Sequence, residues 1–389
     1  MKVSIIVGGR FHAFNMAEEL DKNGYLKEII TSYPKFYVTK NFNIKHNKII
    51  ALPLKEIMSR SFINKYFNLN DKIIDYFDKK ASSLIDLENL DVLVGWSSFS
   101  LNSFLKAKNS KCIKILERGS THIQYQKDIL KEEYNIHGLR PEIPSDYIVA
   151  KEKLEYDLAD YISVPTEFVK KTFINNGIDK SKIIKIPYGV NLKDFKQSRN
   201  KAVINRLDNK TFRIIYVGNS SVRKGVIYLI KSFIELNLQN SELLIIGNID
   251  EDIKPIINLY LKNEKIKYIK AQKQNELYNF YNQSSLFVTC SIEEGLSMVQ
   301  LQAMACGLPV ICTSNSGGDE IIDNNINGFI LPIRDMKALK KKIILLYRDQ
   351  KLCKKMGEQA KMKATKHYSW ENYGKNVIQS YQRLISNNE

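Results

Sequence analysis

The sequence predicts an α/β protein made of two doubly wound, Rossmann-like domains. With 389 residues, the chain is long enough for about two domains that each bury their own core. Short apolar runs typical of buried parallel strands alternate with helical segments through both halves. A polar stretch without periodicity, residues 196–210, is the best linker candidate. We therefore expect an N-terminal domain over residues 1–196 and a second domain over residues 197–368.

The composition is ordinary for a globular protein, with 44% hydrophobic and 26% charged residues. The longest apolar runs fall well below the ~20 residues of a membrane-spanning helix. The N-terminus reads as a strand that enters a glycine loop, without a signal-peptide pattern, so we expect a cytoplasmic protein. The five cysteines form no CxxC pair and the five histidines are scattered, which argues for reduced, buried thiols and against a metal site.

The formal net charge is +17, from 59 basic and 42 acidic residues. Such an excess suits nucleic acid, an anionic membrane or phosphorylated small molecules as partners. Neither zinc-finger spacing nor the aromatic pair of an RNA-recognition domain is present, so nucleic acid is not expected. Residues 42–69 mix apolar and basic side chains, as in a segment that lies on an anionic membrane surface. A helix with lysines at its rim explains the stretch as well, and the codon bias of a low-GC genome explains the charge.

The chain opens with a buried strand over residues 2–7, followed by a loop and a helix. Gly8 and Gly9 allow a ligand to approach the backbone of this loop closely. The loop is not a dinucleotide fingerprint, because the third glycine of GxGxxG is absent. Arg10 and His12 in the same loop are interpreted as solvated residues.

Two further buried strands are expected at residues 91–95 and 112–116. The second runs directly into the segment 117–122, which contains Arg118 and His122. Sites in open α/β sheets lie beyond the carboxyl ends of the strands, so both side chains are expected at the cleft. An imidazole there can hydrogen-bond a ligand hydroxyl or phosphate oxygen, and the alternative for His122 is a satisfied core histidine.

The strand at residues 212–217 opens the second domain and leads through the turn 218–225 into a helix. Cations in the first turn oppose the helix dipole, so Arg223 and Lys224 are more plausible if they serve an anion, although a surface pair remains the alternative. Residues 250–252, Asp-Glu-Asp, are interpreted as the cap of the next helix rather than as a metal site.

The most informative stretch covers residues 291–311. It reads as a loop, a helix over residues 296–306, a stop at Gly307 and a buried strand. Free N–H groups at such a helix start favour phosphate. Glu294 at the edge of the loop and Gln302, about two turns into the helix, can face a sugar and a neighbouring pair of hydroxyls.

The segment EGLSMVQLQAMACGLPVI resembles the E-x7-E signature of family 4 glycosyltransferases, which have the GT-B architecture of two Rossmann-like domains facing a cleft. The resemblance implies that Glu294 contacts the donor sugar and that the loop amides of Gly295, Leu296 and Ser297 contact the diphosphate. It also implies that the residue at 302 grips the ribose, where Gln302 replaces the usual glutamate.

Other segments carry the same resemblance. The turn 218–225 resembles the VGR…KG motif, whose cations clamp the diphosphate. Lys224 matches that motif, Asn219 stands at the Arg position, and Arg223 can supply the lost charge. His122 matches the place of a cleft histidine or aspartate near the transferred sugar. Residues 369–389 resemble the last helix of the family, which crosses back to the N-terminal domain.

The resemblance implies a retaining hexosyltransferase that needs neither metal nor other cofactor and uses a nucleotide-diphosphate sugar, with UDP or GDP as the nucleotide. We expect a role in cell-surface polysaccharide synthesis, with a glycan or lipid-linked acceptor. We also expect a cytoplasmic protein that is either free or peripheral on the inner face of the membrane. A sugar-nucleotide epimerase and a non-catalytic nucleotide-sugar-binding protein are the alternatives. The predicted catalytic residues are His122, Glu294 and Lys224. The predicted substrate-binding residues are Gly8, Gly9, Arg118, Asn219, Arg223, Lys224, Glu294, Gly295, Leu296, Ser297 and Gln302.

Overall fold

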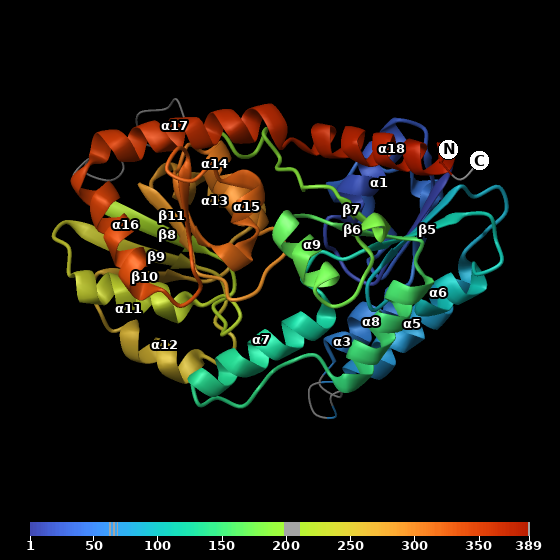
Figure 1. The fold of residues 1–389 in the computed structure, drawn as a ribbon, viewed down its shortest axis with the longest axis horizontal. Coiled ribbons are helices and arrows are strands. Elements are labelled where there is room, and N and C mark those ends of the chain that lie inside the picture. Colours follow the sequence, from blue (N-terminus) through green and yellow to red (C-terminus); the bar gives the residue numbers. More distant parts are fainter. Residues whose placement is uncertain (62–63, 65–66, 68, 198–210, 388–389) are drawn as a thin grey trace.

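A computed structural model describes residues 1–61, 64, 67, 69–197 and 211–387 of the chain. It contains two separate parallel sheets, each covered by helices on both faces (Figure 1). Most of the linker candidate 196–210, and residues 62, 63, 65, 66 and 68 of the amphipathic stretch 42–69, lie outside the described residues.

The first sheet has seven parallel strands in the order β3-β2-β1-β4-β5-β6-β7. Its strands are β1 (Val3–Val7), β2 (Leu26–Thr31), β3 (Ile49–Ala51), β4 (Val92–Trp96), β5 (Ile113–Glu117), β6 (Tyr161–Val164) and β7 (Ile183–Lys185). Every residue of β1, β4 and β5 is buried, as expected for strands covered on both faces.

The second sheet has six parallel strands in the order β10-β9-β8-β11-β12-β13. Its strands are β8 (Phe212–Val217), β9 (Ser241–Ile246), β10 (Ile266–Ile269), β11 (Leu286–Thr289), β12 (Val310–Thr313) and β13 (Gly328–Leu331). In both sheets the strand order reverses direction next to the first strand, which is the doubly wound pattern. The predicted fold class is confirmed.

The helices of the first half are α1 (Ala13–Lys22), α2 (Lys35–Asn41), α3 (Leu54–Ser59), α5 (Asn70–Leu84), α6 (Leu101–Lys106), α7 (Ile123–Ile136), α8 (Asp146–Leu158) and α9 (Glu167–Ile174). Those of the second half are α11 (Val226–Leu236), α12 (Lys254–Tyr260), α13 (Gln274–Asn282), α14 (Met298–Ala305), α15 (Gly318–Ile321), α16 (Met336–Arg348), α17 (Gln350–His367) and α18 (Trp370–Ser386). Short 3-10 turns η1 (His46–Lys48), η2 (Lys180–Lys182) and η3 (Ser314–Ser316) complete the described elements. In Figure 1, α1 and α18 lie on one side of the first sheet and α5, α6 and α8 on the other.

The last helix, α18, lies against the first domain although it follows the second in sequence. It packs on α1, and the Tyr381 hydroxyl lies 3.9 Å from the sulfur of Met16. A Cβ at Gly374 would lie 2.5 Å from Cβ of Glu19, so glycine allows the two helices to approach closely. Tyr373, Val377 and Tyr381 are fully or almost fully buried in this contact.

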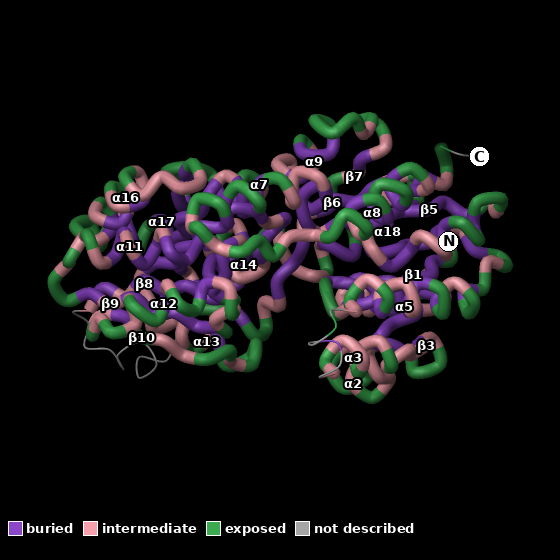
Figure 2. The backbone as a smooth tube through the Cα atoms, turned by 90° about the horizontal axis from the view of Figure 1, so that it is seen from below, coloured by how far each residue is buried: buried purple, intermediate pink, exposed green. Residues whose placement is uncertain are grey.

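Helix α7 crosses in the opposite direction. It begins in the first domain, where Ile123 is buried, and runs toward α12 along the lower edge of Figure 1. Ile129, Leu130 and Tyr134 in its second half belong to the apolar core of the second domain. Figure 2 shows the corresponding two buried regions, coloured purple, around the two sheets.

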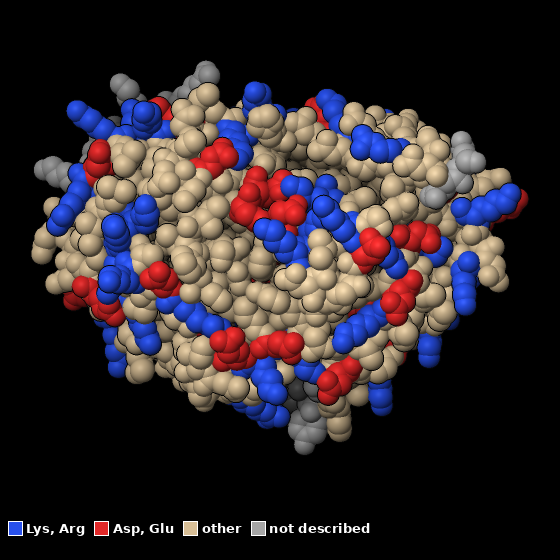
Figure 3. Space-filling view, viewed as in Figure 1, with Lys and Arg blue, Asp and Glu red and all other residues tan. Residues whose placement is uncertain are grey.

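Polar contacts also join the domains on the face shown in Figure 3. Acidic and basic atoms lie side by side there, over the region of α9 and α15 in Figure 1. The Nζ of Lys185 lies 2.7 Å from Oε2 of Glu320, and the Phe168 N–H donates to Oδ2 of Asp319 at 2.8 Å.

All five cysteines are buried and unpaired, in agreement with the predicted thiol state. Within the described part of the chain, no helix combines the length and the apolar character needed to cross a membrane.

Candidate active site

A cleft of about 570 Å³ opens at the carboxyl ends of the strands of both domains. The β1–α1 loop and the turn after β5 form one wall, and the β8–α11 loop and the segment before α14 form the other. Its lining includes Phe11, His12, Gly119, Tyr134, Glu142, Tyr188, Asn219, Arg223, Lys224, Asp250, Asp252, Glu294, Leu296 and Ser297. A cavity of about 700 Å³ near Cys112 and Asp160 lies at the opposite edge of the first sheet and contains none of the predicted site residues. Ligands of doubly wound sheets bind at the carboxyl edge, so the cleft is the candidate site.

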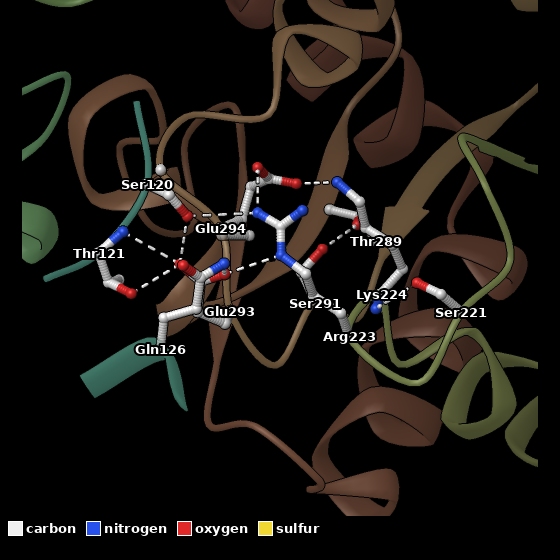
Figure 4. Close-up of polar contacts among 12 residues, drawn as sticks. Ser120, Thr121, Gln126, Ser221, Arg223, Lys224, Thr289, Ser291, Glu293 and Glu294 are labelled. Atoms are coloured by element: carbon white, nitrogen blue, oxygen red, sulfur yellow. Dashed lines mark hydrogen bonds and ion pairs between the residues drawn. The ribbon is translucent and has the colours of Figure 1, made fainter. Parts of the chain in front are cut away.

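Two cations from the β8–α11 loop face a carboxylate in this cleft. Lys224 is in direct contact with the Glu294 carboxylate, and the Arg223 guanidinium donates to Oε1 of Glu294 at 3.1 Å (Figure 4). Gly225, which follows them, has a φ of 58°, and a Cβ there would lie 2.1 Å from the Cys290 carbonyl oxygen. A glycine is therefore needed for the loop to turn into α11 against the end of β11.

The charge of Lys224 depends on its neighbours. Burial and the adjacent Arg223 guanidinium lower the pKa of Lys224 to about 7, and the Glu293 carboxylate acts in the opposite direction. An anion that replaces Glu294 beside the ammonium keeps it protonated. The pair is therefore suited to exchange its carboxylate for a phosphate.

Glu293, next in sequence to Glu294, joins the two domains. Its side chain is fully buried and accepts hydrogen bonds from Ser120 Oγ at 2.5 Å, from the Thr121 N–H at 3.0 Å and from Gln126 Nε2 at 3.2 Å. Nε of Arg223, from its own domain, donates to Oε2 at 2.7 Å (Figure 4). Burial alone raises the pKa of this carboxyl, but the guanidinium and these donors lower it to about 2. Glu293 is therefore ionised and holds Arg223 against the first domain.

His12 lies on the opposite wall. Its side chain is 4% exposed, and Nε2 lies 3.2 Å from Oε2 of the buried Glu117 at the end of β5. The imidazole packs against Trp96 and Tyr188, with ring centroids 5.0 and 4.1 Å away. The interpretation of His12 as a solvated loop residue is wrong, because the loop turns the ring inward onto a carboxylate.

The comparison with protein families decides the class of the second domain. Residues 197–363 match the family described as "Glycosyl transferases group 1". The second domain is therefore similar to group 1 glycosyltransferases.

Two relatives that extend beyond the second domain carry the same class of name. An uncharacterised glycosyltransferase of Methanocaldococcus jannaschii is 24% identical over 380 residues, which is 94% of this chain and 92% of the relative. The capsular polysaccharide biosynthesis glycosyltransferase CapM of Staphylococcus aureus is 27% identical over 272 residues, which is 66% of this chain and 71% of the relative.

Solved structures share the arrangement of both domains. Sucrose-phosphate synthase from Thermosynechococcus elongatus superposes with a TM-score of 0.74 at 17% identity and covers 99% of both chains. Anabaena HepE, in complex with UDP, superposes with a TM-score of 0.70 at 13% identity, over 98% of this chain and all of that chain. The predicted GT-B architecture and the glycosyltransferase class are confirmed, and membership of family 4 stays a prediction.

His122 does not lie in the cleft, so its predicted position is wrong. It is the N-cap of α7, where Nδ1 accepts from the Gln124 N–H at 3.2 Å. Its buried ring packs against Tyr156 and Phe173, with centroids 5.1 and 5.2 Å away. Burial and the Arg118 guanidinium lower the pKa of His122 to about 4, so the ring is a neutral capping group. A helix that starts immediately after the β5 turn directs this side chain into the core.

The predicted cleft position of Arg118 is also wrong. Its guanidinium is buried, with Nε 3.3 Å from Oε2 of Glu152 and a hydrogen bond of 2.7 Å to Oε1 of Gln126. Gly8 and Gly9 shape the loop without lining the cleft. A Cβ at Gly8 would lie 2.1 Å from the ring of Phe99. The backbone in this loop therefore approaches other protein groups rather than a ligand.

Gln302 is buried, and the Tyr281 hydroxyl donates to its Oε1 at 3.1 Å. Gln302 is not among the described residues that line the cleft, so its predicted position beside a ribose is wrong. Almost all of α14 is buried, so apolar periodicity could not single out the face that meets the cleft.

All other predicted residues of the second domain except Gly295 line the cleft. Asn219, Leu296 and Ser297 line it, together with Lys224, Arg223 and Glu294. The Ser297 N–H donates to the Ser316 carbonyl at 3.4 Å. A Cβ at Gly295 would lie 1.9 Å from the Gly119 carbonyl oxygen of the first domain, so this glycine permits the domains to touch.

The acidic triplet at residues 250–252 does not cap α12, and the interpretation as a cap is wrong. The N-cap of α12 is Ile253, with no side-chain cap. Asp250 and Asp252 instead line the cleft, and the Tyr134 hydroxyl donates to Oδ2 of Asp252 at 2.6 Å. In the described parts of the chain, no group of three His, Cys, Asp or Glu side chains is arranged to hold a metal ion.

Proposed function

We propose that this group 1 glycosyltransferase moves a hexosyl group from a UDP- or GDP-sugar to a hydroxyl of a glycan or lipid-linked acceptor. The observation that carries the proposal is the cluster of Arg223, Lys224 and Glu294 at the cleft wall of the matched domain. The complex of HepE with UDP and the name of CapM support a nucleotide-sugar donor and a role in cell-surface polysaccharide synthesis.

The leaving diphosphate requires positive charge that is held in place before reaction. Lys224 and Arg223 supply it, and both are neutralised by Glu294 while no anion is bound. An entering diphosphate takes over these cations and frees the Glu294 carboxylate, which then accepts hydrogen bonds from the donor sugar. Diphosphate binding thereby makes the Glu294 carboxylate available to the donor sugar. A free hexose carries no diphosphate and cannot release this carboxylate.

Transfer with retention of configuration is part of the proposal and rests on the resemblance to the E-x7-E signature. The proposed location is the cytoplasm, with the protein free or peripheral on the inner face of the membrane. Neither other cofactors nor nucleic acid take part.

The test is a screen of UDP- and GDP-sugars for release of free nucleotide, with and without a glycan or lipid-linked acceptor. Nucleotide release that rises when acceptor is added supports transfer, and the anomeric proton coupling of the product reports retention. Conversion of the donor to an epimer without nucleotide release would favour a sugar-nucleotide epimerase. Tight binding without turnover would favour a binding protein.

Activity is expected without a divalent metal, because Arg223 and Lys224 provide the charge that a metal would otherwise supply to the diphosphate. The measurement is the transfer rate in EDTA and after addition of Mg²⁺ or Mn²⁺. Loss of all activity in EDTA with recovery in Mn²⁺ would contradict the expectation and point to Asp250 and Asp252.

The first domain is expected to bind anionic membrane. Phe36 on α2 and Ile57 on α3 are 74% and 65% exposed, and Lys35, Lys40 and Lys55 lie on the same two helices. Vesicles with phosphatidylglycerol should retain the protein at low salt, and less of it at physiological salt, where the screening length is ~8 Å. Phe36→Asp should weaken this retention, whereas equal retention on neutral phosphatidylcholine vesicles would contradict a charge-driven contact.

A further inference from the structure

The surface formed by α16 and α17 carries about half of the excess positive charge of the chain. Residues 336–367 contain eleven lysine and arginine residues and two acidic ones, so their net charge is +9, compared with +17 for the whole chain. They make up fewer than one residue in ten of the sequence. A codon bias raises the lysine content everywhere, so it does not account for this concentration of charge.

Helix α17 has one buried face and one exposed basic face. Its buried residues are Cys353, Met356, Gly357, Ala360 and Ala364. A Cβ at Gly357 would lie 2.1 Å from the Gly307 carbonyl oxygen, so this face is packed closely on the second domain. The exposed face spans about 120° of the helix and includes Lys351, Lys354, Lys355, Met362 and Lys366. We call these five residues the α17 stripe.

The lysines of the α17 stripe are unfavourable for the helix itself. Lys351 and Lys355 are four positions apart, where like charges repel, and Lys351 lies in the first turn, where a cation opposes the helix dipole. Beside the stripe, Lys363 pairs with Asp323 at 2.8 Å. Among the described residues, no carboxylate forms such an ion pair with the lysines of the stripe. Their charge is therefore available to an anion from outside the chain.

A groove of about 610 Å³ adjoins the last part of the stripe. It lies between α17 and the turn that follows α15. Met362 and Ile326 line it and are 62% and 56% exposed. Lys361, Lys363 and Lys366 line the same groove, so an apolar spot is surrounded by cations. An anionic partner with an apolar side chain fits this combination of charge and shape.

The residue types of α17 favour an acidic protein over nucleic acid. The helix contains no arginine, phenylalanine, tyrosine or tryptophan. It therefore lacks the planar guanidinium that holds phosphate through two hydrogen bonds and the aromatic rings on which bases stack. Lysine attracts carboxylates as a point charge and needs neither device.

The position of α17 argues against a membrane as its partner. Helix α17 lies along the upper edge of Figure 1 and α3, which carries part of the expected membrane contact, lies toward the lower edge. The two helices are also well separated in Figure 2. A flat lipid surface in contact with α3 leaves α17 free, and a flat surface does not fill a groove.

We propose that α17 docks an acidic segment of a partner protein. Lys351 and Lys366 are about 22 Å apart along the helix axis, which an extended segment of about seven residues spans. Its carboxylates pair with the lysines of the α17 stripe, and one apolar side chain enters the groove between Met362 and Ile326. The residues of the stripe are not among the described residues that line the cleft, so this interaction is independent of the proposed function.

The test is fluorescence anisotropy of two labelled heptapeptides with the full chain at low salt. One peptide carries three glutamates on each side of a leucine, and the other has glycine in place of the leucine. We expect the leucine peptide to bind with a Kd below about 100 μM. The combined change Lys351→Glu, Lys354→Glu and Lys355→Glu should weaken it by about tenfold or more. Met362→Ser should weaken the leucine peptide about fivefold and leave the glycine peptide unchanged.

The matched control is the combined change Lys79→Glu, Lys80→Glu and Lys108→Glu. These exposed lysines lie in the first domain, and their replacement changes the net charge by the same amount. The control should alter the affinity for either peptide by less than about twofold, and both triple variants should keep the wild-type melting temperature, because all the replaced side chains are exposed. Equal weakening by both triple variants would mean that the peptides respond to net charge alone and would overturn the proposal. A wild type that binds neither peptide would overturn it as well.

Two further results would assign the stripe to another partner and overturn the proposal. Loss of retention on phosphatidylglycerol vesicles in the α17 triple variant, with unchanged peptide affinity, would assign it to a membrane. Binding of single-stranded oligouridylate more tightly than of the leucine peptide, lost in the same variant, would assign it to nucleic acid. Nucleotide release should be the same in the α17 triple variant and the wild type, so failure of the proposed function is seen separately, in the wild type itself.

Discussion

Glu293→Ala is expected to lower the free energy of unfolding by about 3–5 kcal/mol, because it removes a buried carboxylate and leaves several buried donors without their acceptor. The carboxylate is fully buried and binds Arg223 together with donors from Ser120, Thr121 and Gln126. Alanine leaves Nε of Arg223 and these donors without their acceptor, while the Arg223 guanidinium keeps its contact with Glu294. Urea unfolding of variant and wild type measures the difference.

Glu371→Ala is the matched control. Glu371 pairs with Lys375 at 2.9 Å, but both side chains are more than half exposed, so the expected change is within about 0.5 kcal/mol. Because Glu293 links the domains, Glu293→Ala should also have a larger radius of gyration than the wild type in small-angle X-ray scattering. The radius of gyration of the control should equal that of the wild type. Equal stability of the two variants would show that the Glu293 contacts contribute little.

The same contribution should depend on pH. The pKa of Glu293 is lowered from the ordinary 4.5 to about 2. Burial raises this pKa, but Arg223 and the hydroxyl and amide donors lower it by more. A group with a lowered pKa stabilises the fold fully above its unfolded value and loses that effect as the pH falls through its folded value. The gap in stability between wild type and Glu293→Ala should therefore be constant above about pH 4.5 and narrow toward about pH 2.

Lys224→Ala and Glu294→Ala are each expected to lower kcat/KM for the donor by about 10²-fold or more, the usual effect of losing a charge that stabilises the transition state. The two variants should differ in their affinity for the free nucleoside diphosphate. Lys224→Ala removes a cation and should weaken it. Glu294→Ala removes the carboxylate that competes for Arg223 and Lys224, and should strengthen it.

Calorimetry with UDP and GDP and steady-state kinetics with the donor sugar together check this pair. Lys254→Ala, which removes a solvent-exposed lysine paired with Glu251, is the control and should leave both readouts unchanged. If Glu294→Ala weakens diphosphate binding as much as Lys224→Ala, the exchange between carboxylate and phosphate does not occur.

The fold could be predicted because buried parallel strands leave nearly continuous apolar runs, such as VLVGW in β4 and FRIIYV in β8. Lys224 and Glu294 could be predicted because each lies in a loop between the end of a strand and the start of a helix. In a doubly wound sheet the position of such a loop at the cleft follows from the order of the elements. Local pattern was enough for these two residues.

The roles of the remaining site residues depend on the orientation of their side chains, which the local sequence does not encode. Glu293 and Glu294 are neighbours in an irregular loop, and only the packing of the domains decides which carboxylate turns toward Arg223 and the first domain. His12 and Glu117 are separated by 105 residues, so no spacing rule joins them. One signal was available: both follow or end strands of the same predicted sheet, whose carboxyl ends converge.

The crossing of α7 and α18 limits how relatives of this chain can be recombined. Ile129, Leu130 and Tyr134 complete the apolar core of the second domain, and α18 completes that of the first. A chimera joined within residues 196–210 would give each half the wrong helix and leave two unmatched apolar faces. A graft that exchanges one domain should instead keep residues 123–143 with the second domain and residues 370–386 with the first.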